Sequence, residues 1–122
     1  MSIVLDHVNV RCSDLEVTKA FFETVVGLSD GWRPNFPFPG YWLYSGDQAV
    51  VHLVDMSLSG ERSGKGTMDH FAFRGGDYAT QKSAIESAGL KVRQNDVPEL
   101  DMRQLFVTGP DDVVVELQFI GV

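Results

Sequence analysis

Three histidines and one glutamate are the residues of this sequence best suited to chemistry. His7, His52 and His70 are all the histidines of the 122-residue chain, and Glu116 lies near its end. Imidazole nitrogens and carboxylate oxygens both bind divalent cations, and imidazole also carries protons near neutral pH. His70 follows His7 by 63 residues, and Glu116 follows His52 by 64 residues. This near-constant spacing indicates two pairs of equivalent positions.

The spacing reflects an internal repeat of the whole chain. Residues 5–14, LDHVNVRCSD, match residues 68–77, MDHFAFRGGD, with Asp, His, Arg and Asp in register. The match continues with residues 25–28 on 87–90, 44–46 on 107–109 and, after one inserted residue, 49–53 on 113–117. Such a repeat indicates two copies of one structural module.

Each copy has the pattern of a strand, a helix and further strands. Apolar and polar residues alternate with period two at its start, as in a half-buried strand. The spacing of Ser13–Glu16 is typical of a capping box at a helix start, and Gly27 of a helix end. Asp77 and Gly89 bracket the second helix likewise. The predicted elements are strands 3–11, 41–45, 49–55, 68–74, 103–108 and 112–120, a weak strand 90–94, and helices at 14–26 and between Asp77 and Gly89.

These elements predict an α+β fold built from two βαβββ modules, residues 1–56 and 68–122. Residues 57–67, a polar stretch rich in Gly and Ser, are interpreted as the connector. Modules of about 55–60 residues are too small to fold comfortably alone, so we expect one domain over residues 1–122. Because one helix covers only one sheet face, the modules should pair into a curved, open barrel-like sheet with a central cleft.

Strand periodicity places the four chemical residues on one face. The residues of opposite parity are apolar: Val8, Val10, Val51, Leu53, Phe71, Phe73, Val115 and Leu117. These should lie under the helices, so the polar four point together into the cleft. Burying unpaired imidazole or carboxylate groups is costly, and a bound divalent cation removes that cost. Each residue alone could be an ordinary core or rim residue, but together they predict a metal site.

Five short motifs carry a family resemblance: LDHV at 5–8, FF at 21–22, VGL at 26–28, MDHFAF at 68–73 and GPDDVVVEL at 109–117. On these motifs the chain resembles the vicinal oxygen chelate superfamily, which includes glyoxalase I, methylmalonyl-CoA epimerase, extradiol dioxygenases, fosfomycin-resistance enzymes and bleomycin-binding proteins. The resemblance spans nearly the whole chain. It implies paired βαβββ modules around a divalent metal, with His7, His70 and Glu116 as ligands. It says less about the reaction, because one scaffold hosts several chemistries.

His52 stands where glyoxalases of this family usually have Glu and the epimerases Gln. As a fourth ligand, it would leave an octahedral metal two open positions, enough for a substrate that chelates through adjacent oxygens. Chelation lowers the pKa of the intervening C–H, and Glu116 or His52 could accept the proton. The leading hypothesis is therefore a metal-dependent lyase or isomerase of the glyoxalase type.

Two other functions remain open from the sequence. If His52 instead stands off the metal as an acid or base, His7, His70 and Glu116 form a two-histidine, one-carboxylate triad suited to an extradiol-type dioxygenase. A non-catalytic drug or metabolite binder, resembling the bleomycin-binding proteins, is the third hypothesis. The donor set accepts nickel, zinc, manganese, iron or cobalt, so the metal is not specified.

Residues 29–42 concentrate aromatic rings and prolines, and form either a lid over the substrate or an arm against a sheet end or dimer partner. Candidate substrate-binding residues are Trp32, Arg33 and Phe36 from this segment, with Asn9, Arg11, Arg103 and Gln118 from the strands. Cys12 has the opposite strand parity from His7, so a small buried side chain is expected there rather than a nucleophile.

The composition of the chain limits the binding partners and the cellular setting that we expect. The net charge of −7 argues against nucleic acids and anionic membrane surfaces. No apolar run approaches the length of a membrane span, and the first twenty residues do not resemble a targeting signal. A single cysteine cannot form an internal disulfide, which favours a cytoplasmic setting. We expect a small-molecule substrate and a two-fold homodimer, with the modules pairing within one chain or across two.

Overall fold

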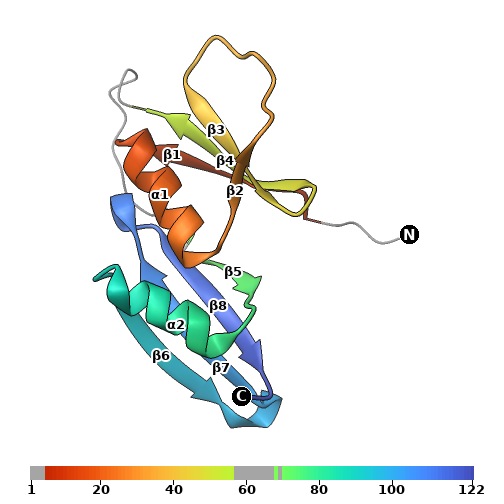
Figure 1. Ribbon diagram of the computed structural model, residues 1–122, viewed down its shortest axis with the longest axis vertical. Coiled ribbons are helices and arrows are strands. Elements are labelled where there is room, and N and C mark those ends of the chain that lie inside the picture. The colour runs from red at the N-terminus through yellow and green to blue at the C-terminus, as the bar shows by residue number, and fades with distance from the viewer. Residues whose placement is uncertain (1–4, 57–67, 69) are drawn as a thin grey trace.

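Each half of the chain forms one four-stranded sheet with one helix (Figure 1). The structure is a computed structural model, and it describes residues 5–56, 68 and 70–122. The predicted connector 57–67, the first residues of the predicted strand 3–11, and Asp69 lie outside the described residues. The predicted α+β class with two βαβββ modules is confirmed.

The first module contains a helix and four strands in the sheet order β1-β4-β3-β2. Its elements are β1 (Val8–Cys12), α1 (Leu15–Val25), β2 (Ser29–Gly31), β3 (Gly40–Ser45) and β4 (Gln48–Asp55). β1 is parallel to β4, and the other pairings are antiparallel. β2 was not predicted, because its three residues, Ser-Asp-Gly, show no apolar alternation.

The second module repeats this order as β5-β8-β7-β6. Its elements are β5 (Phe71–Arg74), α2 (Tyr78–Ser87), β6 (Lys91–Val97), β7 (Met102–Thr108) and β8 (Val114–Ile120), with short 3₁₀ helices η1 (Pro98–Leu100) and η2 (Pro110–Asp112). The weak strand predicted at 90–94 is confirmed as β6. Within residues 5–56, 68 and 70–122, no helix has the length and apolarity needed to cross a membrane.

The start of α1 differs from the predicted capping box. Asp14 is the N-cap, because its carboxylate accepts from the backbone N–H of Val17 at 3.2 Å. Ser13 instead reaches the second module, where its Oγ donates to Asp111 Oδ1 at 2.6 Å. Glu16, the expected partner in the box, accepts from the Tyr41 hydroxyl at 2.5 Å. Tertiary partners therefore outcompete the local pattern at Ser13 and Glu16.

The predicted helix ends are confirmed. Gly27 and Gly89 follow α1 and α2 in the left-handed region, with φ of 81° and 70°. Asp77 caps α2 by accepting from the Thr80 hydroxyl at 2.7 Å and from the Thr80 backbone N–H at 3.0 Å, and these two hydrogen bonds lower the pKa of Asp77.

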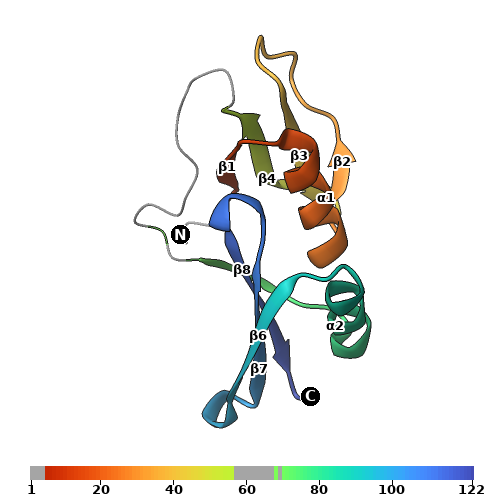
Figure 2. The same ribbon diagram turned by 90° about the vertical axis from the view of Figure 1, so that its left-hand side faces the viewer.

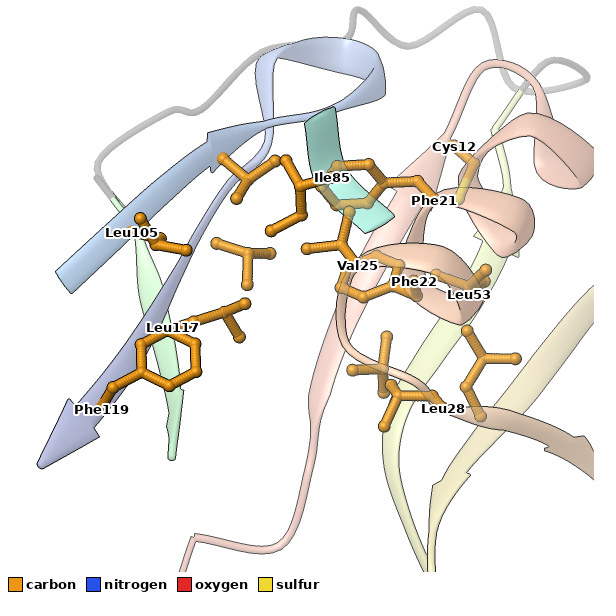
Figure 3. Close-up of a cluster of buried hydrophobic side chains, with 14 residues drawn as sticks. Cys12, Phe21, Phe22, Val25, Leu28, Leu53, Ile85, Leu105, Leu117 and Phe119 are labelled. Atoms are coloured by element: carbon orange, nitrogen blue, oxygen red, sulfur yellow. The ribbon is translucent and has the colours of Figure 1, made fainter. Parts of the chain in front are cut away.

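One hydrophobic core joins the two modules (Figure 3). The two helices lie next to each other (Figures 1 and 2). Phe22 and Val25 of α1 therefore share this core with Ile85 of α2 (Figure 3). The Gln81 side-chain amide donates to the Val25 carbonyl at 3.4 Å, and the Phe22 ring stacks against Phe71. The modules are therefore paired through their helix-covered faces.

Strand parity is confirmed on the covered faces. Val51, Leu53, Val115 and Leu117 are at most 1% exposed, and Val8, Val10, Phe71 and Phe73 pack against the same core. The opposite face of each sheet is consequently the one left for a functional site.

Gly109 tests the packing between modules. Its backbone is extended, but a Cβ there would lie 2.6 Å from the buried Phe21 ring. We expect Gly109→Ala to lower the free energy of unfolding by about 1–3 kcal/mol, measured by denaturant titration. Gly76→Ala is the matched control, because its Cβ would meet only Gln81 at 3.7 Å. Equal stability of the two variants would contradict this packing.

Candidate functional site

The four predicted ligands lie in two separate pairs, one on each sheet. The rings of His7 and His52 stack in the first module, with centroids 3.8 Å apart and planes at 11°. In the second module, His70 Nε2 lies 3.0 Å from Glu116 Oε1. Among residues 5–56, 68 and 70–122, no three His, Cys, Asp or Glu side chains are grouped closely enough to hold one metal ion. The four residues are therefore separated, and we call the His7–His52 pair the first half-site and the His70–Glu116 pair the second half-site.

The half-sites occupy equivalent places in the two modules. His7 and His70 immediately precede β1 and β5, while His52 and Glu116 lie on β4 and β8. In each module an aromatic residue of the next strand is the cross-strand neighbour: Trp42 of β3 beside His52, and Phe106 of β7 beside Glu116. The internal repeat of the sequence thus becomes a repeat of site geometry.

The two ring nitrogens of His7 have different roles, because Nδ1 is hydrogen-bonded to the Asp6 carboxylate. Its Nδ1 lies 2.7 Å from Asp6 Oδ2. A carboxylate only accepts, so Nδ1 is the protonated nitrogen, and in the neutral ring Nε2 carries the lone pair. A carboxylate behind an imidazole is the usual support of a metal-binding histidine, because it fixes the tautomer and raises ligand basicity.

His52 is enclosed by two rings. It stacks against His7 on one side and against Trp42, 4.1 Å away between centroids, on the other. Its Nε2 lies 3.1 Å from the Ala49 carbonyl oxygen, which requires Nε2 to donate. Burial lowers the pKa of His52 below 6.5, and the charge of neighbouring His7 lowers it further. His52 is therefore neutral at pH 7, with Nδ1 able to accept a proton.

A cavity of about 620 Å³ opens beside His7 and His52. Asn9, Arg33 and Phe36, three of the predicted substrate-binding residues, line it. The lining also includes residues absent from that prediction: Asp6, Phe38, Trp42, Tyr44, Asp47, Gln48, Ala49, Leu53 and Val54. The sequence could have placed Trp42 in the cavity only if the β3–β4 register, which pairs it with His52, had been known.

The loop between β2 and β3 forms the aromatic wall of the cavity. Arg33 Nη2 donates to the Phe38 carbonyl at 2.9 Å, and its guanidinium lies about 5 Å from the Phe36 and Phe38 rings. Arg33 thus braces this loop through one of its five N–H donors. Trp32 is 71% exposed and is not part of the cavity lining; it packs edge-on against Trp42.

Glu116 is the buried carboxylate of the second half-site, with 4% exposure. Its Oε2 accepts hydrogen bonds from two side-chain amides, Gln104 Nε2 at 2.9 Å and Gln118 Nε2 at 3.0 Å. Asn95 Nδ2 donates to Gln104 Oε1 at 2.7 Å. Gln118, named above as a candidate substrate-binding residue, therefore orients Glu116. Sequence reasoning missed Gln104 and Asn95, which the β6–β7–β8 register brings to this face.

Two predicted arginines, Arg11 and Arg103, are not part of the cavity lining. Arg103 is the cross-strand neighbour of buried Phe119, so it lies on the helix side of the sheet, opposite Glu116. Its guanidinium sits over the Tyr78 ring, and its Nε is 3.9 Å from Asp96. Arg11 is exposed on β1 and is not part of the cavity lining.

Comparison with known proteins identifies similar folds. No protein-family model and no curated protein matches the chain. A glyoxalase family protein from Bacillus anthracis superposes with a TM-score of 0.76 at 21% identity, covering 97% of this chain and 95% of that one. The fosfomycin resistance protein FosX from Mesorhizobium loti gives 0.72 at 20% identity, covering 100% and 95%. An E126Q mutant of FosX from Listeria monocytogenes, complexed with Mn(II) and 1S,2S-dihydroxypropylphosphonic acid, gives 0.74 at 15% identity, covering 100% and 95%.

Cys12, the last residue of β1, provides a test of burial. It is fully buried, and burial is the main cause that raises its pKa to about 11. We expect the thiol to be inert to a disulfide reagent at pH 8 and to react fully in denaturant. Because the unfolded thiol ionises near pH 9, its contribution to stability should be constant below pH 9 and disappear between about pH 9 and 11. Rapid reaction of the native protein would contradict this placement.

Proposed function

We propose that this chain, which has the fold of the vicinal oxygen chelate superfamily, is a divalent-metal-dependent enzyme of the glyoxalase type. Its substrate would be a small molecule that chelates the metal through adjacent oxygens and undergoes proton transfer. The observation that carries the proposal is the 3.0 Å distance between His70 Nε2 and Oε1 of the buried Glu116. The setting we propose is the cytoplasm.

The geometry of this pair fits two ligands of one ion. Protein nitrogen and oxygen ligands lie about 2.1 Å from such a metal, so neighbouring ligands at right angles are about 3 Å apart. His7 is the third proposed ligand, with Nε2 as the available nitrogen. Manganese is the first metal to test, since the Listeria FosX complex contains Mn(II). The same donors also accept nickel, zinc, iron and cobalt.

We infer that two copies of the chain complete the site. His7 belongs to a different sheet from His70 and Glu116, and the helix-covered faces are already used to pair the modules. In a two-fold dimer, the open face of the first module's sheet in one copy could lie against the open face of the second module's sheet in the other copy. This arrangement would bring His7 of one copy next to His70 and Glu116 of the other. Such an arrangement produces two identical sites.

His52 is better suited to proton transfer than to ligation. A metal lies in the plane of the imidazole that binds it, along the nitrogen lone pair. Because the rings of His7 and His52 are stacked and nearly parallel, with centroids 3.8 Å apart, their nitrogen lone pairs do not converge, and the two histidines would not hold the same ion. His52 is therefore the proposed acid or base, and its lowered pKa keeps it ready to accept a proton at pH 7.

The remaining residues of the cavity would orient the substrate. When bound, the metal would polarise the substrate oxygens and make the adjacent C–H more acidic. Asn9 could donate a hydrogen bond to a substrate oxygen, and the rings of Trp42, Phe36 and Phe38 would exclude water. Arg33, held against the aromatic wall, is positioned to offer its other donors to an anionic group.

Paired variants test the two-copy site. His7→Ala and Glu116→Ala should each lose Mn(II) binding as homodimers. A heterodimer of the two variants, purified with two different tags, should recover about half of the Mn(II) content of the parent, because one of its two sites is intact. Elemental analysis after gel filtration measures the metal content.

The control for this experiment is a heterodimer of the parent chain with the doubly substituted His7→Ala, Glu116→Ala chain. In the two-copy arrangement both of its sites lack a ligand, so it should bind no Mn(II). If each site lay within one chain, the heterodimer of the two single variants would bind no Mn(II), and the heterodimer with the doubly substituted chain would bind about half of the parental Mn(II). A parent protein that binds no divalent metal would refute the proposed function.

A dioxygenase is the second candidate, and the stacking of His52 favours it. With His52 off the metal, three positions remain for dioxygen and a bidentate catechol. The third hypothesis, a non-catalytic binder, predicts ligand binding that survives His7→Ala and Glu116→Ala.

Isotope exchange separates these reactions. We expect the Mn(II)-loaded protein to exchange the C–H hydrogens of hydroxyacetone or dihydroxyacetone in deuterated water, followed by NMR. His52→Gln should keep its metal but slow the exchange by about 10²–10⁴-fold, as for loss of a general base. Dioxygen uptake with catechol and ferrous ion, and no exchange, would instead support the dioxygenase. Full exchange in His52→Gln would overturn the role of His52.

A further inference from the structure

The carboxylate of Glu116 is held in a way that limits what it can do. We propose that Gln104 and Gln118, with Asn95 behind Gln104, are positioning residues that restrict Glu116 to a ligand through one oxygen, Oε1. This inference rests on the proposed metal site.

The hydrogen bonds divide the two carboxylate oxygens between different tasks. Oε2 accepts from both amides, at 2.9 and 3.0 Å, which uses its two lone-pair directions. Oε1 faces His70 Nε2 at 3.0 Å. Because Glu116 is 4% exposed, turning the carboxylate would leave two amide N–H groups without their acceptor in a buried setting.

The direction of the network is fixed by chemistry. A carboxylate cannot donate, so the NH₂ group of Gln104 must face Glu116 and its carbonyl oxygen must face away. That oxygen accepts from Asn95 Nδ2 at 2.7 Å, and Asn95 is exposed on β6. The orientation of the buried ligand is therefore set by a chain of amides that begins at the surface.

The first module supplies an internal comparison. The position equivalent to Glu116 is His52, whose Nε2 donates to a backbone carbonyl. The cross-strand pair equivalent to Gln104 and Gln118 is Gly40 and Val54, which have no side-chain donors. Amide donors thus surround the carboxylate of Glu116 in the second module, which needs hydrogen-bond donors. They are absent from the equivalent positions around His52 in the first module.

The arrangement also separates roles within the proposed reaction. A carboxylate fixed by two amides at one oxygen, and bound to a metal at the other, is not free to accept a proton from substrate. The base is then His52, and Glu116 serves as a ligand.

The test removes the amide donors without removing the ligand. The variants are Gln104→Met, Gln118→Met and the double variant, which keep the side-chain length. The matched control is Gln94→Met on the helix side of β6, because the Gln94 side chain is hydrogen-bonded to Tyr78 and Asp96 rather than to Glu116. We expect the Mn(II) dissociation constant, measured by chelator competition, to rise about 10–100-fold in the double variant. Asn95→Ala, an exposed change that avoids a folding defect, should give a smaller rise in the same direction.

A second readout reports on the carboxylate itself. The infrared bands of Glu116, assigned by difference from Glu116→Gln, should show one-oxygen binding of Mn(II) in the parent and two-oxygen binding in the double variant. Parental affinity and unchanged bands in the double variant would overturn this inference while leaving the metal site intact. A parent that binds no Mn(II) would overturn the proposed function and this inference together.

Discussion

The structure depends on a mismatch between the number of helices and the number of sheet faces. Two sheets have four faces, and the described part of the chain forms one α-helix for each sheet. Apolar packing of α1 against α2 merges the covered faces into one core, in which Phe22, Ile85 and Leu117 are at most 1% exposed. The remaining two faces carry the histidines, the glutamate and the amides.

The two open faces differ in electrostatic character although they share a plan. The first holds stacked imidazole and indole rings that lower the pKa of His52 through burial. The second holds a buried carboxylate surrounded by amide donors and an imidazole. One face is thus suited to a neutral proton acceptor and the other to an anionic ligand, so the modules have diverged in chemistry while keeping their backbone plan.

Much of this fold could be predicted from the sequence, because period-two alternation and an internal repeat are local and readable. The repeat located His7, His52, His70 and Glu116 at equivalent positions, and parity placed Val51 and Leu117 in the core. The sequence could not show which residues meet across strands, so Gln104 and Trp42 were missed. Arg103, a candidate substrate-binding residue, lies on the helix side of its sheet. Ser13 shows the same limit, since its partner Asp111 is 98 residues away. The sequence also did not show that the four residues lie in two separate pairs, because their placement depends on how the two modules pack against each other.

The separation of the two ligand pairs has a consequence for how the protein would respond to its own abundance. On the proposed assembly, the fraction of complete sites follows a mass-action equilibrium in the chain itself. Near the dissociation constant of the dimer, halving the amount of protein would then remove more than half of the functional sites. Expression level would act as a built-in threshold, with little function below it and full function above.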